Sequence, residues 1–263
     1  MDFGLSGKTA VVLASSKGLG RATAEALAAE GCQVGMCSRN EAELKRAAEE
    51  LRSRYKGKIF AQPCDVSKRD DLDRFFQQAQ AVLGPADILV NNAGGPPPGN
   101  TDAFTDAEWQ AAFELNFMSV VRACRHVIPH MKAKRWGRIL TIASISVKEP
   151  IPSLALSNCF RAAVAGYSKT LAMEVGSYNI LSNCVLPGAM LTDRNRQLGA
   201  KVSAERGIAL EAVIAEWEKN LPLKRMGDPM EFGRVMAFLA SERCGFITGA
   251  CIAVDGGSVK GLY

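Results

Sequence analysis

Short apolar runs alternate with longer segments of helical periodicity along most of the chain. Apolar runs of strand length occur at residues 9–14, 33–38, 58–63, 87–92, 137–142, 181–186 and 250–254. Segments with helical spacing lie between them, at residues 21–30, 41–54, 68–83, 106–132, 156–177 and 229–240. The alternation predicts an α/β fold, a Rossmann-like doubly wound sheet of seven parallel strands with helices on both faces.

One segment breaks this rhythm. Residues 189–227 are polar and charged, with a further helix expected around 203–219. We interpret the whole chain, residues 1–263, as a single dinucleotide-binding domain with a lid inserted at about 189–227, over the carboxyl ends of the strands. The proline-rich stretch at 94–100 is expected to be a stiff loop.

Composition narrows the class of partner. The net charge of +5 is mild and basic residues alternate with acidic ones, so no nucleic-acid partner is expected. No apolar stretch approaches the roughly 18 residues of a membrane span, and the start of the chain does not resemble a signal peptide. These features predict a cytoplasmic protein without membrane contact. The eight cysteines form no C-x-x-C pair, so no metal site is expected.

A glycine-containing turn follows the first predicted strand and opens the first predicted helix. It contains Ser15, Lys17, Gly18, Leu19 and Gly20. Such a turn lets a helix N-terminus present free N–H groups to a pyrophosphate, although a turn of this composition can also be only a turn. The nucleotide interpretation gains support from polar or glycine-containing segments after the third, fourth and sixth strands, at 64–66, 91–94 and 187–188.

These motifs, with Asn116, Ser144 and the closing segments at 247–249 and 254–257, occur in an order that resembles the short-chain dehydrogenase/reductase (SDR) family. The resemblance covers essentially the whole chain and is strongest to the 3-oxoacyl-acyl-carrier-protein reductase branch. The resemblance implies that this chain binds a dinucleotide, with one group of residues at the adenine, a second beside the adenine ribose and a third, residues 187–192, at the nicotinamide. The residues concerned are Asp65 and Val66 for adenine, Asn92, Ala93 and Gly94 for the ribose side, and Pro187, Gly188 and Thr192 for the nicotinamide. The chain departs from the family at Leu13 and Ala14, where Thr and the first Gly are usual, and this bulk puts the cofactor affinity in question.

Charge at the end of the second strand bears on the choice of cofactor. No acidic residue stands there to accept a hydrogen bond from an NAD ribose, whereas Arg39 and Lys17 are placed to face a 2′-phosphate. NADP(H) is therefore preferred over NAD(H). Alternatively, both cations are solvated surface charges, and binding is weak or indiscriminate.

The usual proton donor of the family is absent. SDR reductases have a Tyr about thirteen residues after the serine and a Lys four beyond it, but counting from Ser144 gives Ser157 and then Arg161. Tyr167 is expected to face away from Ser157 and to pack. A serine hydroxyl is a far weaker acid than a phenol, and Arg161 stays charged, suited to stabilising an oxyanion rather than giving up a proton.

The candidate catalytic residues are Asn116, Ser144, Ser157 and Arg161. Asn116, together with Asn158, is available to orient water, and Lys148 or Glu149 is a weaker candidate for a titrating group. His126 and His130, four residues apart on one helix, invite a metal or acid–base interpretation. A structural or subunit-contact role is favoured, because no carboxylate partner is evident from the sequence.

The leading functional hypothesis is an NADP(H)-dependent oxidoreductase acting on a carbonyl or alcohol, with an atypical active site. A non-redox enzyme (isomerase, lyase or hydrolase) on the same scaffold, or a nucleotide-sensing protein without turnover, remain alternatives. Apolar residues of the lid favour a small apolar carbonyl or acyl substrate; they are Met190, Leu191, Leu198, Val213, Ile214 and Trp217. Residues 106–132 and the C-terminal segment resemble SDR subunit contacts, which implies a homodimer or homotetramer.

Overall fold

A single parallel sheet organises the chain. The computed structural model describes residues 2–262, and its seven strands lie in the order β3-β2-β1-β4-β5-β6-β7, every neighbouring pair parallel. The strands are β1 (Thr9–Val12), β2 (Gln33–Ser38), β3 (Ile59–Pro63), β4 (Ile88–Asn91), β5 (Gly137–Ile142), β6 (Ile180–Pro187) and β7 (Cys251–Val254). The predicted doubly wound fold is confirmed. From β1 the chain adds strands toward one edge of the sheet as far as β3, and from β4 it adds them toward the other edge as far as β7. Sheets of this kind bind ligands at the change of direction, between β1 and β4.

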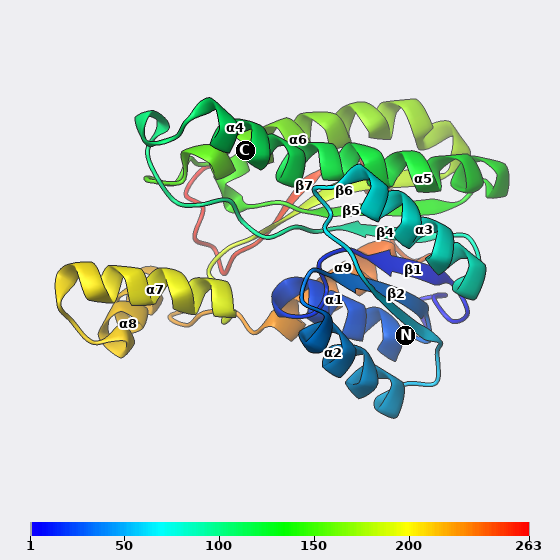
Figure 1. Cartoon of the computed structure of the whole chain (residues 1–263), viewed down its shortest axis with the longest axis horizontal. Coiled ribbons are helices and arrows are strands. Elements are labelled where there is room, and N and C mark those ends of the chain that lie inside the picture. Colours follow the sequence, from blue (N-terminus) through cyan, green and yellow to red (C-terminus); the bar gives the residue numbers. More distant parts are fainter. Residues whose placement is uncertain (1, 263) are drawn as a thin grey trace.

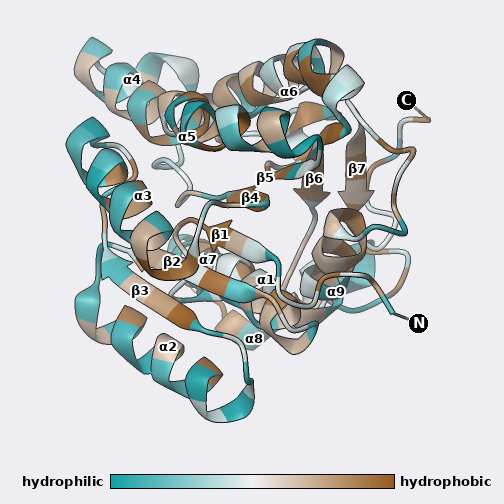
Figure 2. Ribbon diagram, turned by 90° about the vertical axis from the view of Figure 1, so that its right-hand side faces the viewer, coloured by the Kyte–Doolittle hydropathy of each residue, from teal (hydrophilic) through white to brown (hydrophobic). Residues whose placement is uncertain are grey.

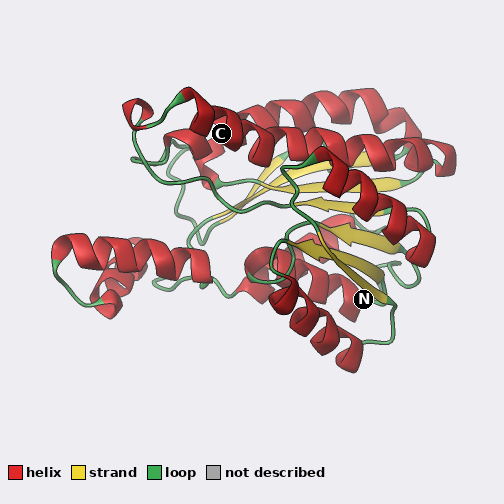
Figure 3. Cartoon of the chain, in the orientation of Figure 1, coloured by secondary structure: helices red, strands yellow, loops and turns green. Residues whose placement is uncertain are grey.

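Helices cover both faces of this sheet (Figure 3). The helices α1 (Gly18–Ala29), α2 (Glu41–Arg54) and α9 (Pro229–Ala240) enclose one apolar layer, which includes Leu27, Leu51 and Phe232. On the other face, α3 (Arg69–Leu83), α5 (Ser119–Lys134) and α6 (Ala155–Val175) enclose a second layer with Phe75, Val127 and Val164. The central strands are buried on both faces and therefore read as continuous apolar runs, which Figure 2 shows between helices with polar outer surfaces.

Two predicted helices are interrupted. The segment 106–132 was expected as one helix, but the chain forms α4 (Asp106–Phe113), a π-helical turn at Glu114–Met118 and then α5. A π-turn accommodates an extra residue without breaking the helical path, so the sequence pattern remains helical across it. The prediction of one helix around 203–219 is wrong. Gly207 adopts φ +63° and ends α7 (Asp193–Arg206), and a second helix, α8 (Leu210–Asn220), follows.

The helices α7 and α8 project from the body of the molecule (Figure 1). They pack against each other where Gly199 leaves room for Leu210 and Trp217, and Arg206 pairs with Glu216 at 2.6 Å. We call these two helices the α7–α8 pair. Short 3-10 turns complete the description, at Thr101–Ala103, Ile145–Val147 and Gly176–Tyr178. Among residues 2–262, no helix is both long and apolar enough to cross a membrane.

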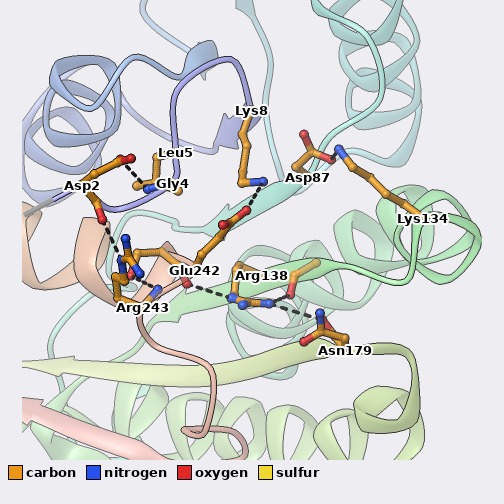
Figure 4. A network of polar contacts seen from close by, with 12 residues as sticks. Asp2, Gly4, Leu5, Lys8, Asp87, Lys134, Arg138, Asn179, Glu242 and Arg243 are labelled. Atoms are coloured by element: carbon orange, nitrogen blue, oxygen red, sulfur yellow. Dashed lines mark hydrogen bonds and ion pairs between the residues drawn. The ribbon is translucent and has the colours of Figure 1, made fainter.

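A polar network closes the end of the sheet at which the strands begin (Figure 4). Its centre is Arg138, 2% exposed, which donates to the carbonyls of Gly137 at 2.9 Å and of Ser241 and Asn179 at 3.3 Å. The guanidinium carbon also lies 4.5 Å from the ring centre of Trp136. Arg138 is thus a buried arginine with a structural role.

The two histidines of α5 have carboxylate partners after all. His126 Nε2 lies 2.8 Å from Asp73, and His130 Nε2 lies 3.6 Å from Asp87. The sequence hid both pairs, because each aspartate comes from a distant segment. No group of three or more metal-ligating side chains exists among the described residues, and neither histidine lines the large cavity described next.

Candidate functional site

A cavity of about 950 Å³ opens at the carboxyl ends of the strands and extends to the α7–α8 pair. Most residues that the sequence assigned to a cofactor line it. They are Lys17, Gly18, Leu19, Arg39, Asp65, Val66, Asn92, Ala93, Gly94, Pro187, Gly188 and Thr192. Ser16, Ser38, Asn40 and Glu43 also line it and were missed, because isolated polar residues at a strand end or in a first helical turn carry no distinctive signal.

Two assigned residues, Ser15 and Gly20, lie behind the cavity wall. Ser15 is fully buried, and its hydroxyl donates to the carbonyl of Val12 at 2.8 Å. A Cβ on Gly20 would come within 2.5 Å of the Asn92 side-chain amide and 2.6 Å of the Ala14 carbonyl oxygen. Both residues therefore shape the glycine turn from inside.

The turn carries a strained residue at its start. Ala14 adopts φ +46°, in the left-handed region that favours glycine, and its carbonyl accepts a hydrogen bond of 2.9 Å from Asn92. Ala14 lines the cavity, so the concern about added bulk applies to its methyl group. The same concern about Leu13 is wrong, because Leu13 is 1% exposed and packs in the core.

The two cations expected to face a 2′-phosphate, Lys17 in the glycine turn and Arg39 after β2, are not equivalent. Lys17 Nζ lies 3.3 Å from Glu43 Oε1, whereas Arg39 is exposed and forms no ion pair within residues 2–262. Glu43 is held in the first turn of α2, where its N–H donates to the Asn40 side chain at 3.1 Å. The sequence shows no acidic residue at the end of β2, but the structure places the carboxylate of Glu43, from the following helix, in the cavity.

Ser144, Ser157 and Arg161 come together in the cavity. Ser144 follows β5, and its hydroxyl oxygen accepts a 3.1 Å hydrogen bond from the Ser146 N–H. Ser157 and Arg161 lie one turn apart on α6, so they share a helix face, and all three residues line the cavity. The Ser157 hydroxyl has no hydrogen-bond partner within the described chain, which leaves it available to a ligand.

Arg161 is a buried cation without an acid. It is 7% exposed, and its guanidinium donates to the carbonyl of Ile142 at 2.8 Å and to that of Ala93 at 3.5 Å. No carboxylate between residues 2 and 262 lies within ion-pair distance of it. Burial lowers the pKa of Arg161 to about 10, so the group remains protonated at neutral pH.

Asn116 and Asn158 occupy different surroundings. Asn116 is buried in the π-turn, where its amide donates to Ala112 at 3.2 Å and its Oδ1 is unpaired. Leu115 lines the cavity, but Asn116 does not. Asn158 exchanges two hydrogen bonds with the backbone of Ile151, at 2.9 and 3.3 Å, so it clamps that loop. Lys148 and Glu149 do not line the cavity either.

No tyrosine among the described residues lines the cavity. Tyr167 packs against Phe117, with ring centres 6.1 Å apart, and burial raises the pKa of its phenol. This arrangement agrees with the sequence-based prediction that Tyr167 packs. The proton donor typical of the resembled family therefore has no phenolic replacement within residues 2–262.

The α7–α8 pair and the residues just before it contribute the far wall. Leu198, Trp217 and Met190, which precedes α7, line the cavity, whereas Leu191, Val213 and Ile214 do not. Sequence reasoning missed Arg194, which also lines it and whose Nη2 donates to the Pro96 carbonyl at 3.0 Å. A lone arginine on a charged helix gives no sequence signal, because only the fold brings it to the loop after β4.

Comparison with known proteins places this geometry in context. A family model described as enoyl-(acyl carrier protein) reductase matches residues 13–259. The 3-oxoacyl-(acyl-carrier-protein) reductase of Chlamydia muridarum is 34% identical over 98% of this chain and 99% of its own. The L-sorbose reductase of Gluconobacter frateurii, solved with NADPH and L-sorbose, superposes over the full length of both chains with a TM-score of 0.95 and 34% identity.

A further solved structure is also similar over nearly the whole chain. It is an NADPH-bound short-chain oxidoreductase of Pseudomonas aeruginosa PAO1, described as containing an atypical catalytic centre. It is 30% identical to this chain, with a TM-score of 0.89, and the match covers 98% of this chain and 99% of that one.

Proposed function

The chain belongs to the short-chain dehydrogenase/reductase family, whose members are oxidoreductases, and from that premise we propose that it interconverts a carbonyl and an alcohol with NADP(H), using Ser144, Ser157 and Arg161 at the reacting oxygen. The observation that carries the proposal is the buried, protonated Arg161 without a carboxylate partner, in one cavity with two serine hydroxyls. A buried cation without a carboxylate partner is costly to the fold and well suited to stabilise negative charge that develops on an oxygen.

The cavity residues fit a dinucleotide. The glycine turn approaches the N-terminus of α1, and Gly18, with φ +59°, leaves a backbone surface without a Cβ toward Thr192. Asp65 and Val66 would hold the adenine, Asn92 to Gly94 the adjacent ribose, and Pro187 to Thr192 the nicotinamide. Arg39 supports NADP(H), because it has no ion-pair partner within residues 2–262 and its guanidinium is therefore available to a 2′-phosphate. The charge of Lys17 is partly neutralised by its ion pair with Glu43. The chemistry supplied by the dinucleotide, when bound, is hydride transfer to or from the carbonyl carbon.

The residues of the chain then act on the substrate oxygen. Ser144 and Ser157 donate hydrogen bonds to it, and Arg161 lowers the energy of the alkoxide that develops there. In this proposal solvent supplies the proton to the alkoxide, because a serine hydroxyl is a weak acid and the Arg161 guanidinium is held by the backbone carbonyls of Ile142 and Ala93. Without a positioned general acid, the rate is expected to lie about 10²- to 10⁴-fold below that of a Tyr-containing relative.

The α7–α8 pair acts in this proposal as the lid of the single domain, closing over small carbonyl substrates through Leu198 and Trp217, with Met190 just before α7 beside them. Exposed apolar residues elsewhere, including Met173 and Phe246, support assembly as a homodimer or homotetramer.

Cofactor binding is tested first. The melting temperature is measured with NADPH and with NADH, and a ligand present at one hundred times its Kd adds about 2.7 kcal/mol of stability. NADPH oxidation is then followed with a panel of aldehydes and ketones. Stabilisation and oxidation together support the proposal. Stabilisation without oxidation favours the nucleotide-sensing alternative, and absence of both favours a non-redox enzyme.

The double variant Ser157→Tyr with Arg161→Lys tests the active site itself. It restores a phenol and an ammonium one helical turn apart, and we expect the reductase rate to rise. Arg138→Lys, at a buried arginine remote from the cavity, is the control and leaves the rate unchanged. No gain in a folded double variant that retains NADPH affinity would contradict the assignment of position 157.

A further inference from the structure

Two arginines, Arg161 and Arg194, line the cavity beside the loop that follows β4, and neither has an acidic partner within residues 2–262. We call this part of the cavity, with Ser157 on the same helix face as Arg161, the substrate end. Arg161 reaches it from α6 and Arg194 from α7. Each is held by one or two backbone carbonyls, so most of the five N–H donors of each group remain free. Although Arg194 as a residue is exposed, its guanidinium lies against Gly95, and partial burial lowers its pKa.

Both groups grip the same short loop. Arg161 donates to the carbonyl of Ala93 and Arg194 to that of Pro96, three residues further along. Both arginines also line the same cavity. A ligand that lies in this cavity along the loop therefore has access to both guanidinium groups.

The acidic residues of the cavity do not neutralise this pair. Glu43 contacts Lys17, and Asp65 accepts hydrogen bonds from Ser67, so both belong to the nucleotide end. Asp193 also lines the cavity and precedes Arg194, but it is exposed and forms no ion pair with it. Adjacent helix positions point about 100° apart, so the two side chains diverge. The substrate end therefore favours an anion.

We propose that the substrate is an oxo acid, or the corresponding hydroxy acid, whose carboxylate is bound by Arg194 while the oxygen that reacts lies at Ser144, Ser157 and Arg161. A guanidinium offers two parallel N–H donors to a carboxylate, which fixes orientation as well as charge. Leu198 and Trp217 line the same cavity, which favours a substrate whose part between the two polar ends is apolar. This inference rests on the proposed function and adds the chemical class of its substrate.

A graded set of ligands tests it. Oxo acids with one to four methylene groups between carbonyl and carboxylate are compared with their methyl esters, which differ only in the charge. Two measurements are made on the NADPH-loaded protein, the shift in melting temperature caused by each ligand and the KM and kcat for NADPH oxidation. At least one acid is expected to bind and react with a KM at least about 10-fold below that of its ester.

The variant Arg194→Gln removes the charge, and Arg196→Gln is its matched control. Arg196 lies on the same helix but does not line the cavity. Arg194→Gln is expected to raise the KM for the acid by about 10- to 100-fold, leaving kcat and the ester nearly unchanged, and Arg196→Gln to change neither. Equal losses for acid and ester would show that Arg194 only fastens α7 to the Pro96 loop, and would overturn the inference.

Failure of this inference is distinguishable from failure of the proposed function. If neutral carbonyls oxidise NADPH and the acids do so no better, the redox function stands and the acid specificity is wrong. If an acid stabilises the protein in an Arg194-dependent way but no ligand oxidises NADPH, the anion site stands and the redox function is wrong.

Discussion

Replacing Arg161 by methionine separates a functional charge from a structural one. Burial lowers the pKa of Arg161 from its ordinary value to about 10. Each pKa unit corresponds to about 1.4 kcal/mol, so keeping this group charged costs the folded state roughly 3 kcal/mol at neutral pH. Methionine has a similar length, fills the space and carries no charge. It removes the 2.8 Å hydrogen bond to Ile142, worth about 1 kcal/mol.

The relief of the buried charge exceeds the loss of the hydrogen bond. We therefore expect Arg161→Met to be as stable as the natural protein or up to about 2 kcal/mol more stable. At about 2–4 °C per kcal/mol for a chain of this size, the melting temperature stays the same or rises by up to roughly 8 °C. The rate moves the other way. Removing one oxyanion-stabilising group typically costs about 10²- to 10³-fold in kcat, measured here as NADPH oxidation at saturating carbonyl substrate.

The pH dependence of the unfolding free energy shows whether the added stability of Arg161→Met comes from removing the buried charge. Because the folded-state pKa of Arg161 is lowered, the unfolded chain binds more protons between pH 10 and 12.5, and the stability of the natural protein rises with pH in this window. The advantage of Arg161→Met is therefore complete at pH 7 and shrinks above about pH 10. Urea unfolding of both proteins at pH 7 and pH 10.5 measures the difference.

Arg138→Met is the matched control, since Arg138 is equally buried and bound to backbone carbonyls but lies in the polar network of Figure 4, far from the cavity. It loses three hydrogen bonds and the contact with Trp136, so we expect lower stability and an unchanged kcat. If Arg161→Met is destabilised as much as Arg138→Met and keeps its kcat, Arg161 is structural and the reasoning is refuted.

Three further outcomes are expected. Ala14→Gly relieves the left-handed strain at φ +46°, so it should raise the melting temperature by a few degrees and tighten NADPH binding; a lower melting temperature would contradict this account. Glu43→Gln frees Lys17 and should increase the ratio of NADPH to NADH affinity by about 2- to 10-fold in titrations, whereas an unchanged ratio would place both residues outside the phosphate site. Gly20→Ala should unfold or strongly destabilise the protein in thermal melts, because its methyl group meets the Ala14 carbonyl at 2.6 Å; normal stability would show that the turn can relax.

The order of strands and helices was readable from the sequence, because buried parallel strands need continuous apolar runs and amphipathic helices need a polar face. The motifs at strand ends located the cavity for the same reason, since every strand of a parallel sheet ends at the same edge. The resemblance to the family, with its spacing counted from Ser144, was enough to find that Ser157 and Arg161 stand where a tyrosine and a lysine are usual. That these two positions share a helix face follows from helical spacing, which is local information.

Only the tertiary structure decided which charges meet. The pairing of Glu43 with Lys17, the acids beside His126 and His130, and the approach of Arg194 to Pro96 join segments from 26 to 98 residues apart along the chain. The isolation of Arg161 from every carboxylate of the described chain is likewise a result of packing. Electrostatic interactions depend on distance in space and on burial, and neither is encoded in the local pattern of the sequence.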